Sequence, residues 1–230
     1  MPVVEIGLMG VKPEHKVMDL TTTEGQVLEK AWSAVTVAPG GPHWAYGGVE
    51  IDKPLLLWGF FAFDSIEHHR EFAKTGGAEA VKDLPKILSH PVFEKHITVA
   101  GDFSIVLEAP TVQVTILYFP STISASEKEK VEIAAEELII KRINASQDVQ
   151  AVKLGWSVEN NFPMLQPGAT VDQSGIALSL FVGWTSVKAR EEFVRDFDLV
   201  SELKKNGKSD SMIGEVTRLI ECRKFGSSRQ

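Results

Sequence analysis

The 230-residue sequence has little cysteine and no long apolar run, and each shortage excludes a class of protein. Cys222 is the only cysteine, so an internal disulfide is impossible. The first ten residues, MPVVEIGLMG, have neither the basic residues nor the apolar stretch of a signal peptide. The longest apolar run, residues 55–63, is about half as long as a membrane-spanning helix. We therefore expect a cytoplasmic protein with no membrane partner.

Basic residues are also fewer than acidic ones. With 24 Lys and Arg against 31 Asp and Glu, the net charge is -7, which argues against nucleic acid as a partner. The sequence has no GxSxG, Walker A, HExxH or CxxC motif, and no GxGxxG after a predicted strand. Serine-hydrolase, nucleotide and zinc-protease chemistry therefore lose support.

An internal repeat is present instead. Residues 55–72 (LLLWGFFAFDSIEHHREF) align with residues 177–193 (ALSLFVGWTSVKAREEF) when the chain is shifted by 121 positions, which places Phe60 on Phe181 and Phe63 on Trp184. Each copy is an apolar strand that runs directly into a helix. In the first copy Asp64 and Glu67 have the spacing of a capping box, and in the second Thr185 or Ser186 can cap the helix.

Reading outward from this repeat predicts the order βαββαβ twice. The first half has strands at residues 3–9, 44–51, 55–63 and 93–100, and helices at 22–37 and 65–88 with a break at Gly76-Gly77. The second half has strands at 112–119, 149–158, 176–184 and 214–222, and helices at 124–143 and 186–205, the first opened by Ser124 and Glu127.

This order predicts an α+β fold of two tandem ferredoxin-like units, residues 1–108 and 109–230. Strands such as residues 55–61 are apolar on both faces, so both faces of each sheet should be covered. We expect helices to cover one face and the other half of the chain to cover the second face. The expected architecture is an intrachain pseudo-dimeric α+β barrel, with its two sheets packed against each other.

The element order resembles the dimeric α+β barrel superfamily as a fused pseudo-dimer. Within it, DSIEHHREF and SHPVFEKHITV resemble the antibiotic-biosynthesis-monooxygenase and stress-responsive A/B-barrel families, although His90-Pro91 departs from the spacing of the second. The monooxygenase resemblance implies a small enzyme of secondary metabolism without metal, flavin or other cofactor. Its substrate would be an apolar polycyclic or aromatic compound that reacts with oxygen once deprotonated.

All six histidines lie in the first 96 residues, so imidazole chemistry belongs to the first half. His68 and His69 are adjacent on a predicted helix and diverge by about 100°, so they cannot chelate one metal together, and we expect no metal site. His68 aligns with Ala189 on a core-facing stripe, whereas His69 aligns with Arg190, which should reach solvent. The inward histidine is therefore predicted to be His68.

The predicted pocket lies in the first half, between its sheet and helices. Candidate catalytic residues are His68, then His43, and Tyr46, while Trp44, Trp58, Phe60 and Phe72 are candidate substrate contacts. The aromatic residues are equally typical of sheet packing, and His68 of a core histidine.

Three classes of function stay open at this point. The first is a cofactor-free oxygenase. The second is a cyclase, isomerase, decarboxylase or pericyclase that uses the same pocket. The third is a non-enzymatic stress-response or ligand-binding protein. The sequence also leaves a homodimer open.

Overall fold

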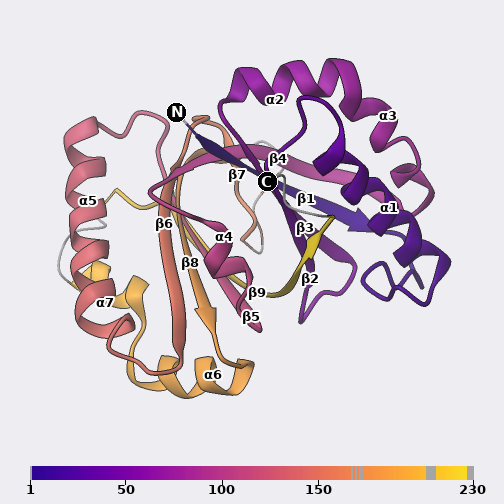
Figure 1. Cartoon of the computed structure of the whole chain (residues 1–230). Coiled ribbons are helices and arrows are strands. Elements are labelled where there is room, and N and C mark those ends of the chain that lie inside the picture. The colour runs from indigo at the N-terminus through magenta and orange to yellow at the C-terminus, as the bar shows by residue number, and fades with distance from the viewer. Residues whose placement is uncertain (1, 167, 169, 171–172, 206–210, 227–230) are drawn as a thin grey trace. The chain divides into compact units, whose positions relative to one another are not determined.

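The computed structural model describes residues 2–166, 168, 170, 173–205 and 211–226 (Figure 1). The chain divides into two compact units. Unit 1 is Met1–Val99 together with Ile220–Gln230, and unit 2 is Ala100–Leu219, whereas the sequence predicts a division after residue 108. No helix in the described residues is both long and apolar enough to cross a membrane.

Unit 1 has a four-stranded antiparallel sheet in the order β2-β3-β1-β4, and the end of strand β9 pairs with β2. Helices α1 to α3 cover one face of this sheet (Figure 1). The elements are β1 Val3–Val11, α1 Thr23–Val37, β2 Ala45–Glu50, β3 Leu56–Phe63, α2 Ile66–Phe72, the π-helical turn Ala73–Gly77, α3 Ala78–Ala80, the 3-10 turn Leu84–Lys86 and β4 Leu88–Val99.

Unit 2 has the same strand order in its sheet. Its strands lie side by side in the order β6-β8-β5-β9. Its buried core lies between β8 and the helices α5 and α7. The elements are α4 Ser104–Leu107, β5 Thr111–Phe119, α5 Ala125–Leu138, the π-helical turn Ile139–Ile143, β6 Val149–Ser157, β7 Phe162–Pro163, β8 Ser174–Trp184, α6 Val187–Asp196, α7 Leu199–Lys205 and β9 Gly214–Phe225.

Both units therefore have the ferredoxin-like βαββαβ order, with the first strand between the third and the fourth. The α+β fold class is confirmed. The packing of the two sheets against each other stays a prediction.

The 121-residue repeat is confirmed at the strand-to-helix junctions. β3 ends at Phe63 and β8 at Trp184, the two aligned positions. The side chains of Ser65 and Ser186 each accept a hydrogen bond of 3.1 Å from the backbone N–H three residues later. The prediction that Asp64 caps the first helix is wrong, because Ser65 does so. The capping box at Ser124 and Glu127 is confirmed.

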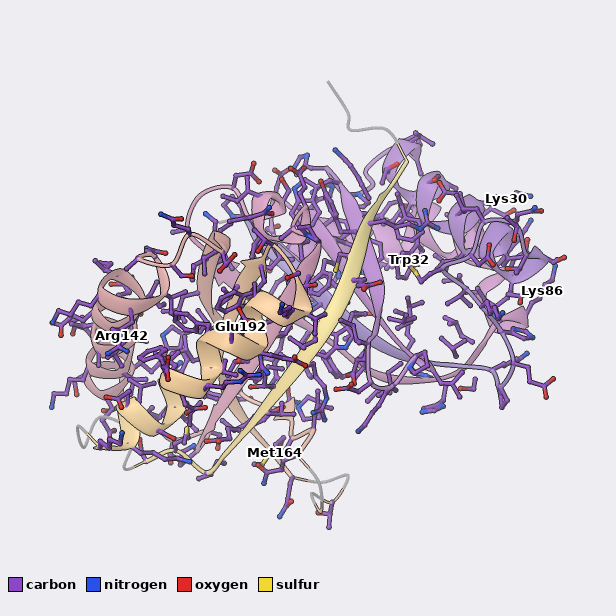
Figure 2. The ribbon with its side chains drawn as sticks, turned by 90° about the horizontal axis from the view of Figure 1, so that it is seen from below. Lys30, Trp32, Lys86, Arg142, Met164 and Glu192 are labelled. Carbon is purple, nitrogen blue, oxygen red and sulfur yellow. The ribbon has the colours of Figure 1, made fainter. Side chains whose placement is uncertain are left out.

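Helix α1 approaches the sheet of unit 1 very closely. Trp32 is 1% exposed and packs edge-on against Phe61, with ring centroids 5.3 Å apart. A Cβ atom at Gly47 would lie 2.1 Å from the Trp32 ring, and one at Gly59 would lie 3.2 Å from it. In Figure 2 Trp32 lies beside the strands, whereas Lys30 of the same helix lies at the outer margin. The two glycines, which pair across β2 and β3, leave the space that the indole fills.

Pairing across unit 1 also determines which side chains share a sheet face. Glu5 on β1 lies opposite Phe61 on β3 and opposite His96 on β4. Directly opposed residues project from the same face, so these three side chains face the helices. Tyr46 and Phe60 are another opposed pair, and they project from the other face.

We predict that Ser65→Ala and Ser186→Ala each destabilise the chain by about 1 kcal/mol, because each loses a helix N-cap. For a chain of this size the melting temperature should fall by about 2–4 °C, measured by circular dichroism. Ser121→Ala, an exposed change in the turn before α5, is the matched control and should leave the melting temperature unchanged. Equal melting temperatures in all three variants would contradict the two caps.

Candidate functional site

A cavity of about 230 Å³ lies in unit 1 between the sheet and the helices. Its walls are mainly apolar, with three titratable side chains at one part of the lining. The lining residues are Glu5, Val35, Pro42, Phe61, Phe63, His69, Phe72, Ala73, Gly77, Ala78, Val81 and Glu94. An apolar pocket with a few polar groups is the usual form of a small-molecule site.

Two cavity-lining side chains belong to a buried polar chain. His69 Nε2 lies 3.2 Å from Glu5 Oε2, and His69 Nδ1 lies 2.9 Å from His96 Nε2. Glu5 and His69 are each 9% exposed, and His96 is 5% exposed. The neutral tautomers fit if His69 Nε2–H donates to Glu5 and His96 Nε2–H donates to His69 Nδ1. Both nitrogens of His69 are therefore oriented by partners.

Charge in the cavity is unbalanced. Burial raises the pKa of Glu5 well above its ordinary value, and the charge of Glu94 raises it further. Among the described residues that line the cavity, none is Lys or Arg. Glu5 is thus a buried carboxyl group whose proton is held more tightly than usual, and such groups cluster at functional sites.

His69, not His68, points toward the sheet, so the predicted orientation of this histidine pair is wrong. His69 and Phe72 are three residues apart on α2 and both line the cavity. Arg190, which aligns with His69, is only partly exposed and also turns toward its sheet. Its Nε donates a 3.0 Å hydrogen bond to Gln113 on the sheet of unit 2.

The same register identifies the counterpart of Glu5. Val3 pairs with Phe63, and Thr111 pairs with Trp184. Glu5, two residues after Val3, therefore corresponds to Gln113. Unit 2 has a contact between Gln113 and Arg190 where unit 1 has Glu5 and His69. The cavity beside it measures only about 40 Å³.

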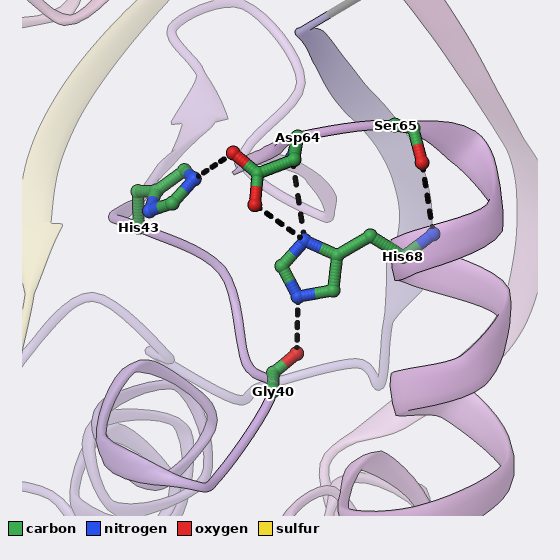
Figure 3. Close-up of polar contacts among 5 residues, drawn as sticks. All are labelled: Gly40, His43, Asp64, Ser65 and His68. Carbon is green, nitrogen blue, oxygen red and sulfur yellow. Dashed lines mark hydrogen bonds and ion pairs between the residues drawn. The ribbon is translucent and has the colours of Figure 1, made fainter.

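His68 and His43 lie together in a separate, more exposed cluster around Asp64 (Figure 3). His43 Nε2 donates to Asp64 Oδ1 at 2.8 Å, and His68 Nδ1 lies 3.3 Å from Asp64 Oδ2. His68 Nε2–H donates to the carbonyl of Gly40 at 2.8 Å. The hydrogen bond from His43 lowers the pKa of Asp64, and the charges of the two histidines lower it further. This cluster connects α2 to the loop that carries Pro42, a cavity-lining residue.

The remaining predicted residues divide between the two sheet faces. Phe72 lines the cavity, as expected. Tyr46, Trp58 and Phe60 are at most 2% exposed and project from the opposite face, and Trp44 packs edge-on against Tyr46. Trp58 Nε1 donates to Glu50 at 3.0 Å and its ring stacks on Phe60. Their expected place in the cavity wall is therefore wrong.

Sequence reasoning missed Glu5, His69, Glu94 and His96. A sequence signal was present for Glu5, Glu94 and His96. Glu5 is the one charged residue in the strand sequence VVEIGLMGV. Glu94 and His96 are two residues apart on a strand, a spacing that places both on one face.

No family model and no curated protein matches the sequence. Solved structures match its fold over nearly the whole chain. An anthrone oxidase-like protein has a TM-score of 0.64 and 13% identity, with 99% of this chain and 95% of that chain covered. A protein from Fusobacterium nucleatum described as a putative monooxygenase has a TM-score of 0.61 and 11% identity, with 100% of this chain and 96% of that chain covered.

A second protein described in this way, from Lactobacillus acidophilus NCFM, has a TM-score of 0.58 and 11% identity, with 98% of this chain and 96% of that chain covered. At these identities the matches show a common fold.

We predict that His43→Ala raises the pKa of Asp64, because the variant loses the hydrogen bond that favours the carboxylate. The carboxyl ¹³C resonance of Asp64, followed against pH, measures this pKa directly. His68→Ala should raise it less, since His68, 3.3 Å from Asp64, lowers this pKa only through its charge and less than the His43 hydrogen bond does. An unchanged titration in His43→Ala would show that the two side chains do not interact in solution.

Proposed function

We propose that the chain is a monooxygenase-like enzyme that binds a small apolar aromatic substrate in the cavity of unit 1. The main support is the buried row of polar contacts from Glu5 through His69 to His96, beside an otherwise apolar cavity. The common fold with proteins described as monooxygenases and as anthrone oxidase-like is consistent with this proposal.

The cavity is suited to an aromatic ring. Phe61, Phe63 and Phe72 line it together with Val35 and Val81. Aromatic side chains bind planar rings through offset or edge-on contacts. Its volume of about 230 Å³ is below the usual range for drug-sized ligands, so the substrate is small and contains few rings.

The Glu5–His69 pair supplies a proton acceptor beside this ring. A buried carboxyl group with a raised pKa is a stronger base than an ordinary one, and general bases work best when their pKa lies near the operating pH. His69 Nε2–H holds the Glu5 carboxylate through one oxygen, which leaves the other oxygen for the substrate. His96 fixes the orientation of His69 through Nδ1.

Removal of a proton from an activated ring CH₂ group yields a carbanion that can react with molecular oxygen. One oxygen atom stays on the carbon as a ketone, and the other leaves as water with the two hydrogens of the CH₂ group. Molecular oxygen is the only oxidant that this reaction needs. The resemblance noted in the sequence implies this route, in which the protein supplies no flavin.

We predict that Glu5→Gln and His69→Phe each lower turnover by about 10²-fold or more, because each removes part of the proton acceptor. Oxygen uptake with anthrone and a panel of small phenols measures turnover, and product mass shows whether oxygen is incorporated. His68→Phe is the matched control, since this neighbour contacts Asp64 and Gly40 outside the cavity lining.

Equal turnover in the His68 and His69 variants, at equal melting temperatures, would contradict the assignment to His69. A product formed without oxygen uptake would favour the cyclase or isomerase class. No turnover of any panel compound, together with no binding of aromatic ligands, would favour the non-enzymatic class.

A further inference from the structure

Three side chains of the unit 1 cavity are arranged as metal ligands. Glu5, His69 and Glu94 each offer one ligand atom, and these atoms all lie within 4.8 Å of one another. Among the described residues, this is the only such group of three or more His, Cys, Asp or Glu side chains. We propose that Glu5, His69 and Glu94 bind one divalent transition-metal ion, a site that goes beyond the proposed proton transfer.

The distances fit an ion placed between the three side chains. Zinc lies about 2.0–2.2 Å from histidine nitrogens and carboxylate oxygens. Two such ligands at adjacent coordination positions are therefore roughly 3–3.5 Å apart. The observed distance between His69 Nε2 and Glu5 Oε2 is 3.2 Å, so these two ligands are already at the required separation. The ligand atom of Glu94 lies within 4.8 Å of the other two, and this exposed side chain would move closer to them to complete the site.

The surroundings of His69 match those of a metal-binding histidine. Such histidines almost always hydrogen-bond through the ring nitrogen that does not bind the ion, which fixes the ring orientation. With the ion on Nε2, His69 carries its proton on Nδ1 and donates it to His96 Nε2 at 2.9 Å, the reverse of the tautomers that suit the ion-free Glu5–His69 pair. Since His96 is 5% exposed, the ring of His69 is held from behind by a buried partner. His96 is a positioning residue in this site.

Charge favours a cation in the same place. Two carboxylates and no Lys or Arg belong to the described lining of this cavity. A divalent ion would balance the two negative charges, one of which is buried. One imidazole with two carboxylates suits zinc, manganese or iron(II) better than magnesium or calcium, which prefer oxygen ligands alone. With three protein ligands, a coordination position stays open toward the cavity.

This site has a definite relation to the proposed function. An ion bound to Glu5 Oε2 and His69 Nε2 withdraws electron density from the carboxylate, so the other Glu5 oxygen becomes a weaker base for the substrate proton. Ion binding and the proposed proton transfer therefore oppose each other. If the proposed function holds, the ion inhibits oxygen uptake.

The test uses the whole chain after dialysis against EDTA, titrated with ZnCl₂ and separately with MgCl₂ by isothermal calorimetry. We expect one Zn²⁺ per chain and much weaker binding of Mg²⁺. Glu94→Gln should weaken Zn²⁺ binding at least tenfold without a loss of folding, because Glu94 is exposed. His69→Gln should weaken it further, and His96→Gln by about 10–100-fold as an outer partner.

Asp64→Asn is the matched control, because it alters the other histidine cluster and none of the three ligands. It should bind Zn²⁺ like the wild type. Absence of stoichiometric binding, or equal affinity in the wild type, Glu94→Gln and His69→Gln, would overturn the proposal. Loss of binding in Asp64→Asn alone would also overturn it, since the ion would then occupy the His43 cluster.

Oxygen uptake separates this proposal from the proposed function. Stoichiometric binding with inhibition by Zn²⁺ supports both. Stoichiometric binding with activity that EDTA abolishes and a metal ion restores supports the site and contradicts metal-free proton removal. Activity without ion binding supports the proposed function and overturns the site.

Discussion

The organisation of unit 1 depends on one buried carboxylate on the helix-covered face of its sheet. Glu5 lies in a strand whose neighbours are apolar, and an isolated charge there would cost several kcal/mol. His69 from α2 and His96 from β4 supply the polar contacts that make this burial tolerable. Glu5 thus makes the core less stable and also supplies a titratable group to the cavity.

The two units show how one fold supports different sites. In unit 1 an acid meets an imidazole, and in unit 2 an amide meets a guanidinium, Gln113 with Arg190. The second pair has no group that exchanges protons near neutral pH, because an amide does not titrate and Arg stays charged. Similar backbones therefore carry different polar pairs at equivalent positions.

Much of the fold could be predicted from the sequence, because strand ends, helix caps and the 121-residue repeat are local patterns. Ser124 with Glu127, and the junctions at Phe63 and Trp184, follow from neighbouring residues alone. The site could not be predicted in the same way. Glu5 and His96 meet through strand pairing, and His69 joins them only through the rotation of a short helix. One position of helical rotation exchanges His68 for His69.

The π-helical turn Ala73–Gly77 has a consequence for how this cavity could diversify. Ala73, Gly77 and Ala78 form part of the wall with almost no side-chain volume, and they are distant in sequence from Glu5, Glu94 and His96. Larger residues at the two alanines would shrink the space for a ring while the polar residues stay in place. Under the proposed function, the size of the substrate would thus depend on residues other than Glu5, Glu94 and His96, so a lineage could change that size and retain these three side chains.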